Sequence, residues 1–208
     1  DRSSATAKAN LVEYRKQVAA VRKKEQDMKA GLEIFAIEPP ANKETADTEK
    51  NLELLELIWA MIEEWNGLMD GWKYGQFATM DTGSIEATTQ SFSKRIQKLY
   101  KEFKGTNQPW KVLDDLKNRV ESIKKLMPLI MDLRNEAMRD RHWKQLMEDI
   151  GKTFDPYADS FTLELVLDLG LEQYGNEIGT MATTAGKELA IEEALVKIEA
   201  LWDELTLD

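Results

Sequence analysis

The sequence predicts an all-α protein, an elongated bundle of long antiparallel helices with heptad-like packing. Only 5 of its 208 residues are proline, and the residues that lose little rotamer freedom in a helix, such as Ala, Leu, Glu and Lys, are plentiful. Apolar residues recur at alternating spacings of three and four, the pattern of helices that pack lengthwise on one another. The alternation typical of a strand is confined to the final residues, 205–208.

Composition and charge restrict the possible functions. Apolar residues make up 42% and charged residues 32% of the chain, a globular balance, and cysteine is absent. The sequence holds no apolar run of the roughly 20 residues that a membrane span needs, and its start at Asp1 fits an excised fragment. Residues 152–208 account for the whole net charge of −10. This acidity argues against nucleic acid or anionic membrane as a ligand and fits either a solvated helix face or a docking face for a basic partner.

The first two helices follow from their apolar spacing. A heptad-like stripe runs along residues 4–36, and Pro39-Pro40 should stop this helix. The stripe consists of Leu11, Tyr14, Val18, Val21, Met28, Leu32 and Phe35. After a polar link, a second helix begins with Thr48 or Asp47 as its N-cap, and Trp59, Trp65 and Trp72 lie on its apolar face. At this spacing the three rings predict an aromatic core rather than a groove for a ligand or partner.

The middle of the chain predicts three more helices. The third covers about 84–104, with Gly105 as its C-cap, and the fourth starts at Pro109. Its apolar pattern resumes in phase after Pro128, which predicts a kink rather than an end. Asn135 is a candidate cap for the fifth helix, which should end at Gly151.

The C-terminal part predicts a short apolar turn over 162–169 and a long helix over 171–205. The apolar stripe of the long helix includes Trp202, which we assign to the aromatic core with the three earlier tryptophans. Gly175, Gly179 and Gly186 each disfavour the helix by about 1 kcal/mol relative to alanine, so its first half should fray or bend.

Catalytic chemistry finds little support in the sequence. His142 is the only histidine, which excludes multi-histidine metal sites, and no nucleophile elbow accompanies it. The string from Gly179 to Lys187 has the wrong glycine spacing for a phosphate loop and no preceding strand. The carboxylates of one acidic helix share one environment, which favours a solvated face over paired general acids; these are Glu188, Glu192 and Glu199. We therefore expect neither an enzyme nor a bound cofactor or metal.

One ordered set of motifs is specific. Pro128-Leu129-Ile130 is followed by Arg141-His142-Trp143. This resembles the linker region of dynein heavy chains, in which a Leu-Pro-Leu-Ile-like segment leads into an Arg-His-Trp signature; Met127 in the first position is a mild departure. The tryptophan-rich helix upstream and the long helix that ends in Trp202 are also similar to the family, so the resemblance covers about 14–208.

The resemblance implies a mechanical role. Dynein is a microtubule motor, and its linker is a helical arm that joins the tail to the AAA+ ATPase ring and changes shape during the ATP cycle. Residues 1–47 would form the tail-end helix and connecting turn, and residues 48–208 the N-terminal portion of the linker. The implied partners are the AAA+ ring and tail of the same heavy chain, other dynein subunits, and microtubules through the parent motor, with no nucleic acid or membrane.

Two questions stay open from the sequence. The tryptophan-rich segment and the Leu-Arg-Asn stretch at 133–135 are more typical of axonemal than of cytoplasmic heavy chains, which predicts a cilium or flagellum, with the cytoplasm as the alternative. Heptads and tryptophans would also fit a spectrin-like scaffold or interaction module, although no internal repeat supports one.

Overall fold

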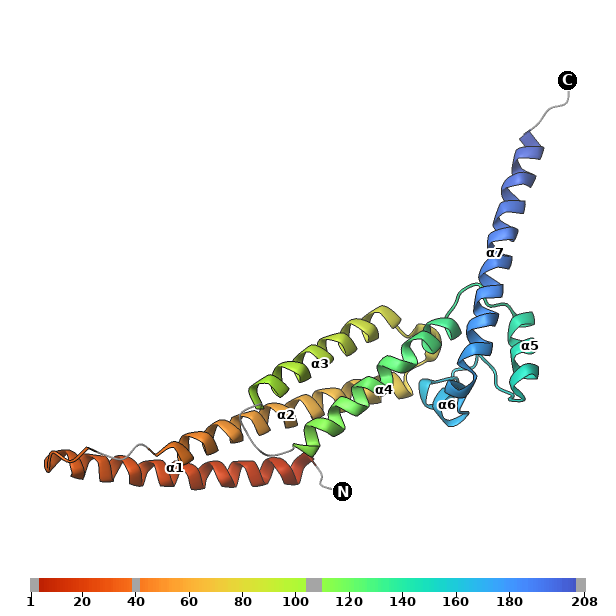
Figure 1. The fold of residues 1–208 in the computed structure, drawn as a ribbon. Helices are drawn as coiled ribbons and strands as arrows, with labels where there is room; N and C mark the ends of the chain where they lie inside the picture. The colour runs from red at the N-terminus through yellow and green to blue at the C-terminus, as the bar shows by residue number, and fades with distance from the viewer. Residues whose placement is uncertain (1–3, 39–41, 104–109, 205–208) are drawn as a thin grey trace. The chain divides into compact units, whose positions relative to one another are not determined.

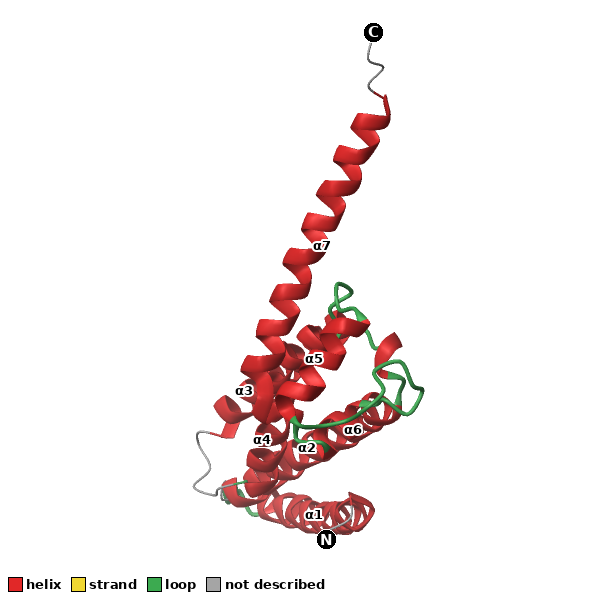
Figure 2. Cartoon of the chain, turned by 90° about the vertical axis from the view of Figure 1, so that its right-hand side faces the viewer, coloured by secondary structure: helices red, strands yellow, loops and turns green. Residues whose placement is uncertain are grey.

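The structure is a computed structural model that describes residues 4–38, 42–103 and 110–204. Within these ranges the all-α prediction is confirmed, and the only β-type pairing is an isolated bridge between Gln76 and Thr162 (Figure 2). The elements are α1 (Ser4–Ile34), α2 (Lys43–Tyr74), η1 (Phe77–Thr79), α3 (Thr82–Phe103), α4 (Lys111–Leu133), α5 (Asp140–Ile150), α6 (Leu163–Asp168), η2 (Leu171–Tyr174) and α7 (Gly175–Glu204) (Figure 1). The predictions at Pro39-Pro40, Gly105, Pro109 and 205–208 lie outside the described residues.

The chain divides into two compact units. Unit 1 consists of residues 1–69 and 98–116, and unit 2 of residues 70–97 and 117–208. Unit 1 therefore holds α1, most of α2, the end of α3 and the start of α4. Unit 2 holds the remainder of these helices together with α5, α6 and α7.

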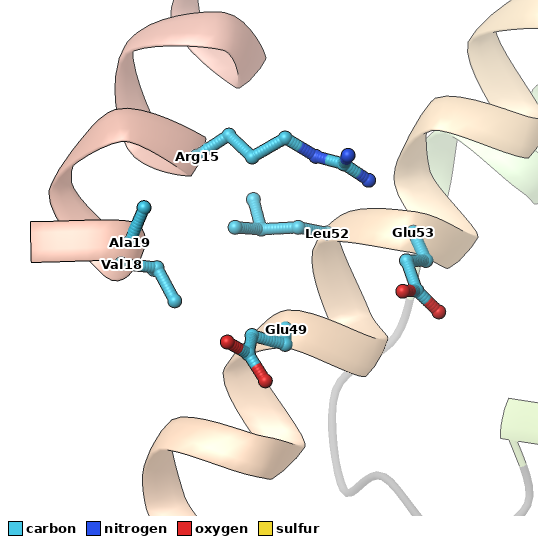
Figure 3. A pocket seen from close by; sticks show the side chains of 6 residues that line it. All are labelled: Arg15, Val18, Ala19, Glu49, Leu52 and Glu53. Carbon is cyan, nitrogen blue, oxygen red and sulfur yellow. The ribbon is translucent and has the colours of Figure 1, made fainter. Parts of the chain in front are cut away.

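In unit 1, α1 and α2 are joined by a regular series of ion pairs, here called the α1–α2 ladder. Its three pairs are Lys8–Glu63, Arg15–Glu56 and Arg22–Glu49. Each step of seven residues forward along α1 is matched by a step of seven backward along α2, which defines an antiparallel heptad register. Figure 3 shows this seam, where Leu52 points from α2 toward α1 while the Arg15 side chain reaches from α1 toward α2.

The predicted apolar stripe of α1 consists of two rows of side chains, and only one of these rows faces α2. Leu11 is buried and Val18 and Leu32 are half-buried. The second row, spaced by seven residues, is exposed; it consists of Tyr14, Val21, Met28 and Phe35. The prediction that the whole stripe packs on partner helices is therefore wrong within the described residues. A single neighbouring helix covers one row, and the second row lies about 60° further round the helix, at 3.6 residues per turn.

Helix α4 continues through Pro128 to Leu133, as the in-phase apolar pattern predicts. Helix α2 begins at Lys43, before its predicted N-cap at Asp47 or Thr48. The fifth helix also differs from its prediction. It begins at Asp140 rather than near Asn135, whose side-chain oxygen instead accepts a hydrogen bond from the Ala137 backbone within the connecting turn. Gly151 ends α5 in the left-handed conformation (φ +65°), where a residue without Cβ is favoured.

The core of unit 2 gathers apolar side chains from each of its helices. Buried members include Phe92 of α3, Ile130 of α4, Leu146 of α5, Val166 of α6 and Ile178 of α7. Only the first part of α7 takes part: Ala182 and Ala185 are buried, whereas the large apolar residues between Ile191 and Trp202 are at least 50% exposed. Helix α7 is thus packed over its first half and exposed over its second. It is continuous from Gly175 to Glu204, so the predicted fraying of its glycine-containing first half is not observed.

Candidate functional site: the α5–α7 clamp

The first turn of α5 fixes the orientation of His142. The backbone N–H of Arg139 donates to Nδ1 of His142 at 3.0 Å, so the proton of the neutral ring sits on Nε2. That atom donates to Oε2 of Glu188 on α7 at 2.9 Å. The ring is 4% exposed, and both of its nitrogens are satisfied by these two bonds. His142 therefore connects the start of α5 to α7.

Arg141 binds the same carboxylate. Its Nε and Nη2 atoms donate to Oε2 of Glu188 at 3.0 and 2.6 Å, and Nη2 also donates to Oε1 of Glu192 at 2.9 Å. Glu188 and Glu192 lie four residues apart, on one face of α7. We call these four residues, Arg141, His142, Glu188 and Glu192, the α5–α7 clamp. Arg139 approaches it from the rim, with Nη2 3.6 Å from Oε2 of Glu192.

Electrostatics in the clamp favour the charged forms. The hydrogen bonds from Arg141 and then His142 hold the pKa of the Glu188 carboxyl below its usual range. The carboxylates of Glu192 and Glu188 raise the pKa of the Arg141 guanidinium. The Arg141 side chain is 56% exposed and that of Glu188 40%, so salt should weaken their ion pair. The bond from buried His142 is better shielded from solvent.

Trp143 fixes the other side of α5. Its side chain is 6% exposed, and its ring meets that of Phe154 edge-on at a centroid distance of 6.1 Å. The contacts continue from Phe154 to Phe161 at 5.3 Å and from Phe161 to Phe77 at 5.1 Å. Neighbouring residues of the signature thus serve two purposes, because Arg141 and His142 bind α7 while Trp143 packs on a row of aromatic rings.

The other half of the signature lies in α4. Leu129 is 6% and Ile130 0% exposed, whereas Pro128 is exposed. After α4 the chain makes a second connection to α7, because the Asn135 side-chain amide donates to the Ala182 carbonyl at 3.1 Å. The two halves of the signature therefore occupy successive helices, one supplying core side chains and the other the clamp.

The four tryptophans assigned to an aromatic core have different environments. Trp65 is fully buried in unit 1, and Trp59 in the same unit is half-buried. Trp72, in unit 2, is also half-buried. Trp202 is 68% exposed, so its assignment to the core is wrong. The apolar periodicity of α7 continues to Trp202, but among the described residues no other element packs against that half of the helix.

The sequence favours a solvated face for Glu188, Glu192 and Glu199. Glu199 is exposed, and the side chains of Glu188 and Glu192 are 40% and 45% exposed, but these two carboxylates also bind Arg141 in the clamp. The sequence signal for the clamp was a pair of carboxylates one helical turn apart, Glu188 and Glu192. A second part of the signal was the adjacent hydrogen-bond donors Arg141 and His142. Sequence spacing alone does not reveal which distant helix face these groups meet.

The arrangement holds two helices together. Oε2 of Glu188 already accepts hydrogen bonds from Arg141 and His142, which leaves it a poor general base. Among the residues that the structure describes, no three acidic or histidine side chains are grouped to bind a metal ion. In the same ranges, none of the helices combines the length and apolar character needed to cross a membrane.

Comparison with known proteins gives a consistent result. The family model described as "Dynein heavy chain, N-terminal region 2" matches residues 45–208. The chain is similar to dynein axonemal heavy chain 2 of Homo sapiens (39% identity over 198 residues, 95% of this chain) and to that of Mus musculus (36% over 198 residues, also 95%). It is also similar to the dynein-1-beta heavy chain of the flagellar inner arm I1 complex of Chlamydomonas reinhardtii, with 38% identity over 187 residues, or 90% of this chain. The chain spans 4% of the length of each of these relatives.

Proposed function

Because the chain belongs to the dynein heavy chain family, within its N-terminal region 2, we propose that it is the tail end and tail-proximal part of the linker of an axonemal dynein. In this proposal residues 1–47 are the tail-end part, with α1, the connection and the start of α2, and residues 48–208 are the N-terminal portion of the linker. The segment transmits force between the tail and the AAA+ ring of the same heavy chain and works in the axoneme of a cilium or flagellum. The family match over 45–208 is the observation that carries the proposal.

The packing of the helices supports a force-bearing role. Helices α1, α2 and α7 have 31, 32 and 30 residues, or about 45 Å each at 1.5 Å per residue. The α1–α2 ladder opposes small axial displacements of one helix along the other, since any shift of less than a heptad would separate its three pairs. In unit 2, the clamp and the close-packed aromatic rings add stiffness, because packed interiors are poorly compressible.

The energy source in this proposal lies elsewhere in the heavy chain. The AAA+ ring hydrolyses ATP, microtubules are engaged by the parent motor, and other dynein subunits join the complex. This segment contributes no cofactor and no catalytic step. Its acidic C-terminal part disfavours nucleic acid and anionic membrane as direct ligands.

The proposal is tested in the intact heavy chain. A fluorescent donor is placed on exposed Lys144 of α5 and an acceptor on the AAA+ ring, and energy transfer is measured without nucleotide and during ATP turnover. A lever requires the transfer efficiency to change between these states. A control pair at Lys144 and Lys124, both in unit 2, should report no change.

An unchanged signal in a motor that still hydrolyses ATP would contradict the lever. It would leave the spectrin-like scaffold as the alternative, which the relatives named above, all dynein heavy chains, do not support. Trp143→Ala in the intact motor gives a second readout. If the segment is a lever, the substitution should slow microtubule gliding more than it slows ATP hydrolysis. If the segment is a passive scaffold, the substitution should change neither rate.

A further inference from the structure

Helix α7 changes its surroundings abruptly at its centre. Ala185 is fully buried, whereas beyond the clamp the large apolar side chains are exposed; these are Ile191, Leu195, Val196, Ile198, Leu201 and Trp202. Among the described residues, Glu192 is the last on α7 with a hydrogen bond or ion pair to another helix. The second half of α7 therefore leaves the packed part of unit 2 as a continuous helix.

Gly186 stands where this change occurs. Glycine is among the weakest helix formers because its backbone keeps the most freedom in the unfolded state. Packing does not explain this glycine, since a Cβ added at Gly186 would have no neighbour within 4 Å. Gly179 differs, because a Cβ there would lie 3.2 Å from Oδ2 of Asp132. Gly186 is therefore a weak point in the helix with no packing requirement.

The clamp bridges this weak point. Ala182 is bound by Asn135 before Gly186, and Glu188 and Glu192 are bound by Arg141 and His142 after it. Both attachments come from the α4–α5 segment, 135–142, so a bend of α7 at Gly186 away from α5 would separate Glu188 and Glu192 from Arg141 and His142. We propose that Gly186 is a hinge of α7 and that the α5–α7 clamp holds this hinge straight. Releasing the clamp lets the second half of α7 swing as an intact helix.

The chemistry of the clamp makes it releasable. Three of its four side chains are substantially exposed, and its ion pairs depend on Arg141 bridging two carboxylates. Such pairs are screened by salt, because the Debye length falls from about 10 Å at 0.1 M to about 3 Å at 1 M ionic strength. The mechanical meaning of the hinge rests on the proposed lever role, whereas its existence is a property of unit 2 alone.

Spin-label distances in the 208-residue chain test the proposal. The sequence has no cysteine, so labels can be introduced at exposed Lys144 of α5 and at one of two positions on α7. Lys197 lies beyond Gly186 and Thr183 before it, and both are exposed. Arg141→Met should widen the 144–197 distance distribution and leave the 144–183 distribution unchanged. High salt should widen the same distribution, and the control variant Glu199→Gln should not.

A second substitution identifies the hinge. Adding Gly186→Ala to Arg141→Met should narrow the 144–197 distribution again, because alanine fits there and favours the helix. The matched control is Gly175→Ala, which also has no neighbour within 4 Å of the added Cβ but lies before the packed part of α7. It should leave the widened distribution unchanged.

Three outcomes would overturn the proposal. The 144–197 distribution could stay narrow both in Arg141→Met and in the double variant Glu188→Gln/Glu192→Gln. The 144–197 distribution of Arg141→Met could stay wide after Gly186→Ala is added. Far-ultraviolet circular dichroism could show that the widened state has lost helix, which would mean unwinding rather than bending. None of these measurements uses ATP or the rest of the heavy chain, so they fail or succeed independently of the lever test.

Discussion

Nε2 of His142 lies 2.9 Å from Oε2 of Glu188, a residue 46 positions later in the chain. Arg141 donates two hydrogen bonds to the same oxygen. The first two residues of the Arg-His-Trp signature therefore converge on one carboxylate of α7, while the third packs on Phe154. The clamp gives the first two residues of this signature a structural purpose, the attachment of α5 to α7.

Trp143→Ala should lower the free energy of unfolding by about 3–5 kcal/mol, the usual cost of truncating a large buried aromatic side chain. Trp143 is 6% exposed and begins the aromatic row that continues through Phe154 to Phe161. Chemical denaturation followed by circular dichroism measures the change.

Trp202→Ala is the matched control, because that ring is 68% exposed. It should change the stability by no more than about 0.5 kcal/mol. Equal losses for the two variants would contradict the different environments of these tryptophans.

A double-mutant cycle on Arg141 and Glu188 should show favourable coupling. The single variants Arg141→Met and Glu188→Gln each remove the ion pair, so the double variant should lose less stability than the two single losses together. The coupling should shrink as salt is raised, since both side chains are well exposed. A coupling energy of zero at low salt would mean that the Arg141–Glu188 ion pair contributes nothing to the stability of the fold.

The stabilisation from Glu188 should depend on pH with a defined sign. Its pKa is lower in the folded chain than the usual value of about 4.3, so the ionised form stabilises the fold at neutral pH. This contribution is present above the unfolded pKa and is lost as the pH falls through the lowered folded pKa. The stability difference between the wild-type chain and Glu188→Gln should therefore begin to shrink near about pH 4. Glu199→Gln, at an exposed position, is measured in parallel to control for the loss of one surface carboxyl group.

The sequence predicts the helices well because apolar spacing is a local signal. The in-phase pattern on both sides of Pro128 correctly indicates that α4 continues. Apolar spacing fails to predict burial where burial depends on whether a distant helix lies against the apolar face. The periodicity of α7 extends to Trp202, but periodicity states only that one face is apolar, and here the second half of that face has no described neighbour.

The clamp illustrates the same limit. His142, Arg141 and Glu188 each stand out in the sequence, yet their meeting depends on the path of the chain between α5 and α7. An acidic helix face looks the same in sequence whether it faces water or an arginine. Only the folded arrangement shows that Glu188 and Glu192 are bound while Glu199 is not.

The Tyr100 hydroxyl should ionise at a higher pH than an ordinary tyrosine. Burial, together with the hydrogen bond from its hydroxyl to the Asp114 carboxylate, raises the pKa of Tyr100 to about 12. Ultraviolet absorbance of tyrosinate during an alkaline titration should contain a component near this value, and Tyr100→Phe should remove it. Asp114→Asn should lower the pKa of Tyr100 only in part, because burial is the larger cause. Since the folded pKa lies above the usual value of about 10, the protonated phenol stabilises the fold below that pH, and this stabilisation is lost as the pH rises toward 12.

The register of the α1–α2 ladder can be tested by exchanging charges. Arg22 binds Glu49 through two hydrogen bonds of 2.8 and 3.0 Å, and the carboxylate raises the pKa of the guanidinium. Arg22→Glu should lower the melting temperature, because it places a carboxylate opposite Glu49 and beside Glu25. Glu49→Arg should lower it as well. The exchange variant Arg22→Glu/Glu49→Arg should recover part of the loss in both single variants, with the remainder reflecting the new repulsion from Glu25.

The control for that exchange moves the partner by one heptad. Combining Arg22→Glu with Glu56→Arg restores no opposed pair in the observed register, because Glu56 lies opposite Arg15 and not Arg22. This variant should therefore melt below Arg22→Glu alone, since the arginine introduced at position 56 faces Arg15 and adds a second like-charged contact. Equal recovery from the two exchanges, measured by circular dichroism at low salt, would mean that α1 and α2 slide freely. A pair of helices that slides in this way could not transmit force along its length.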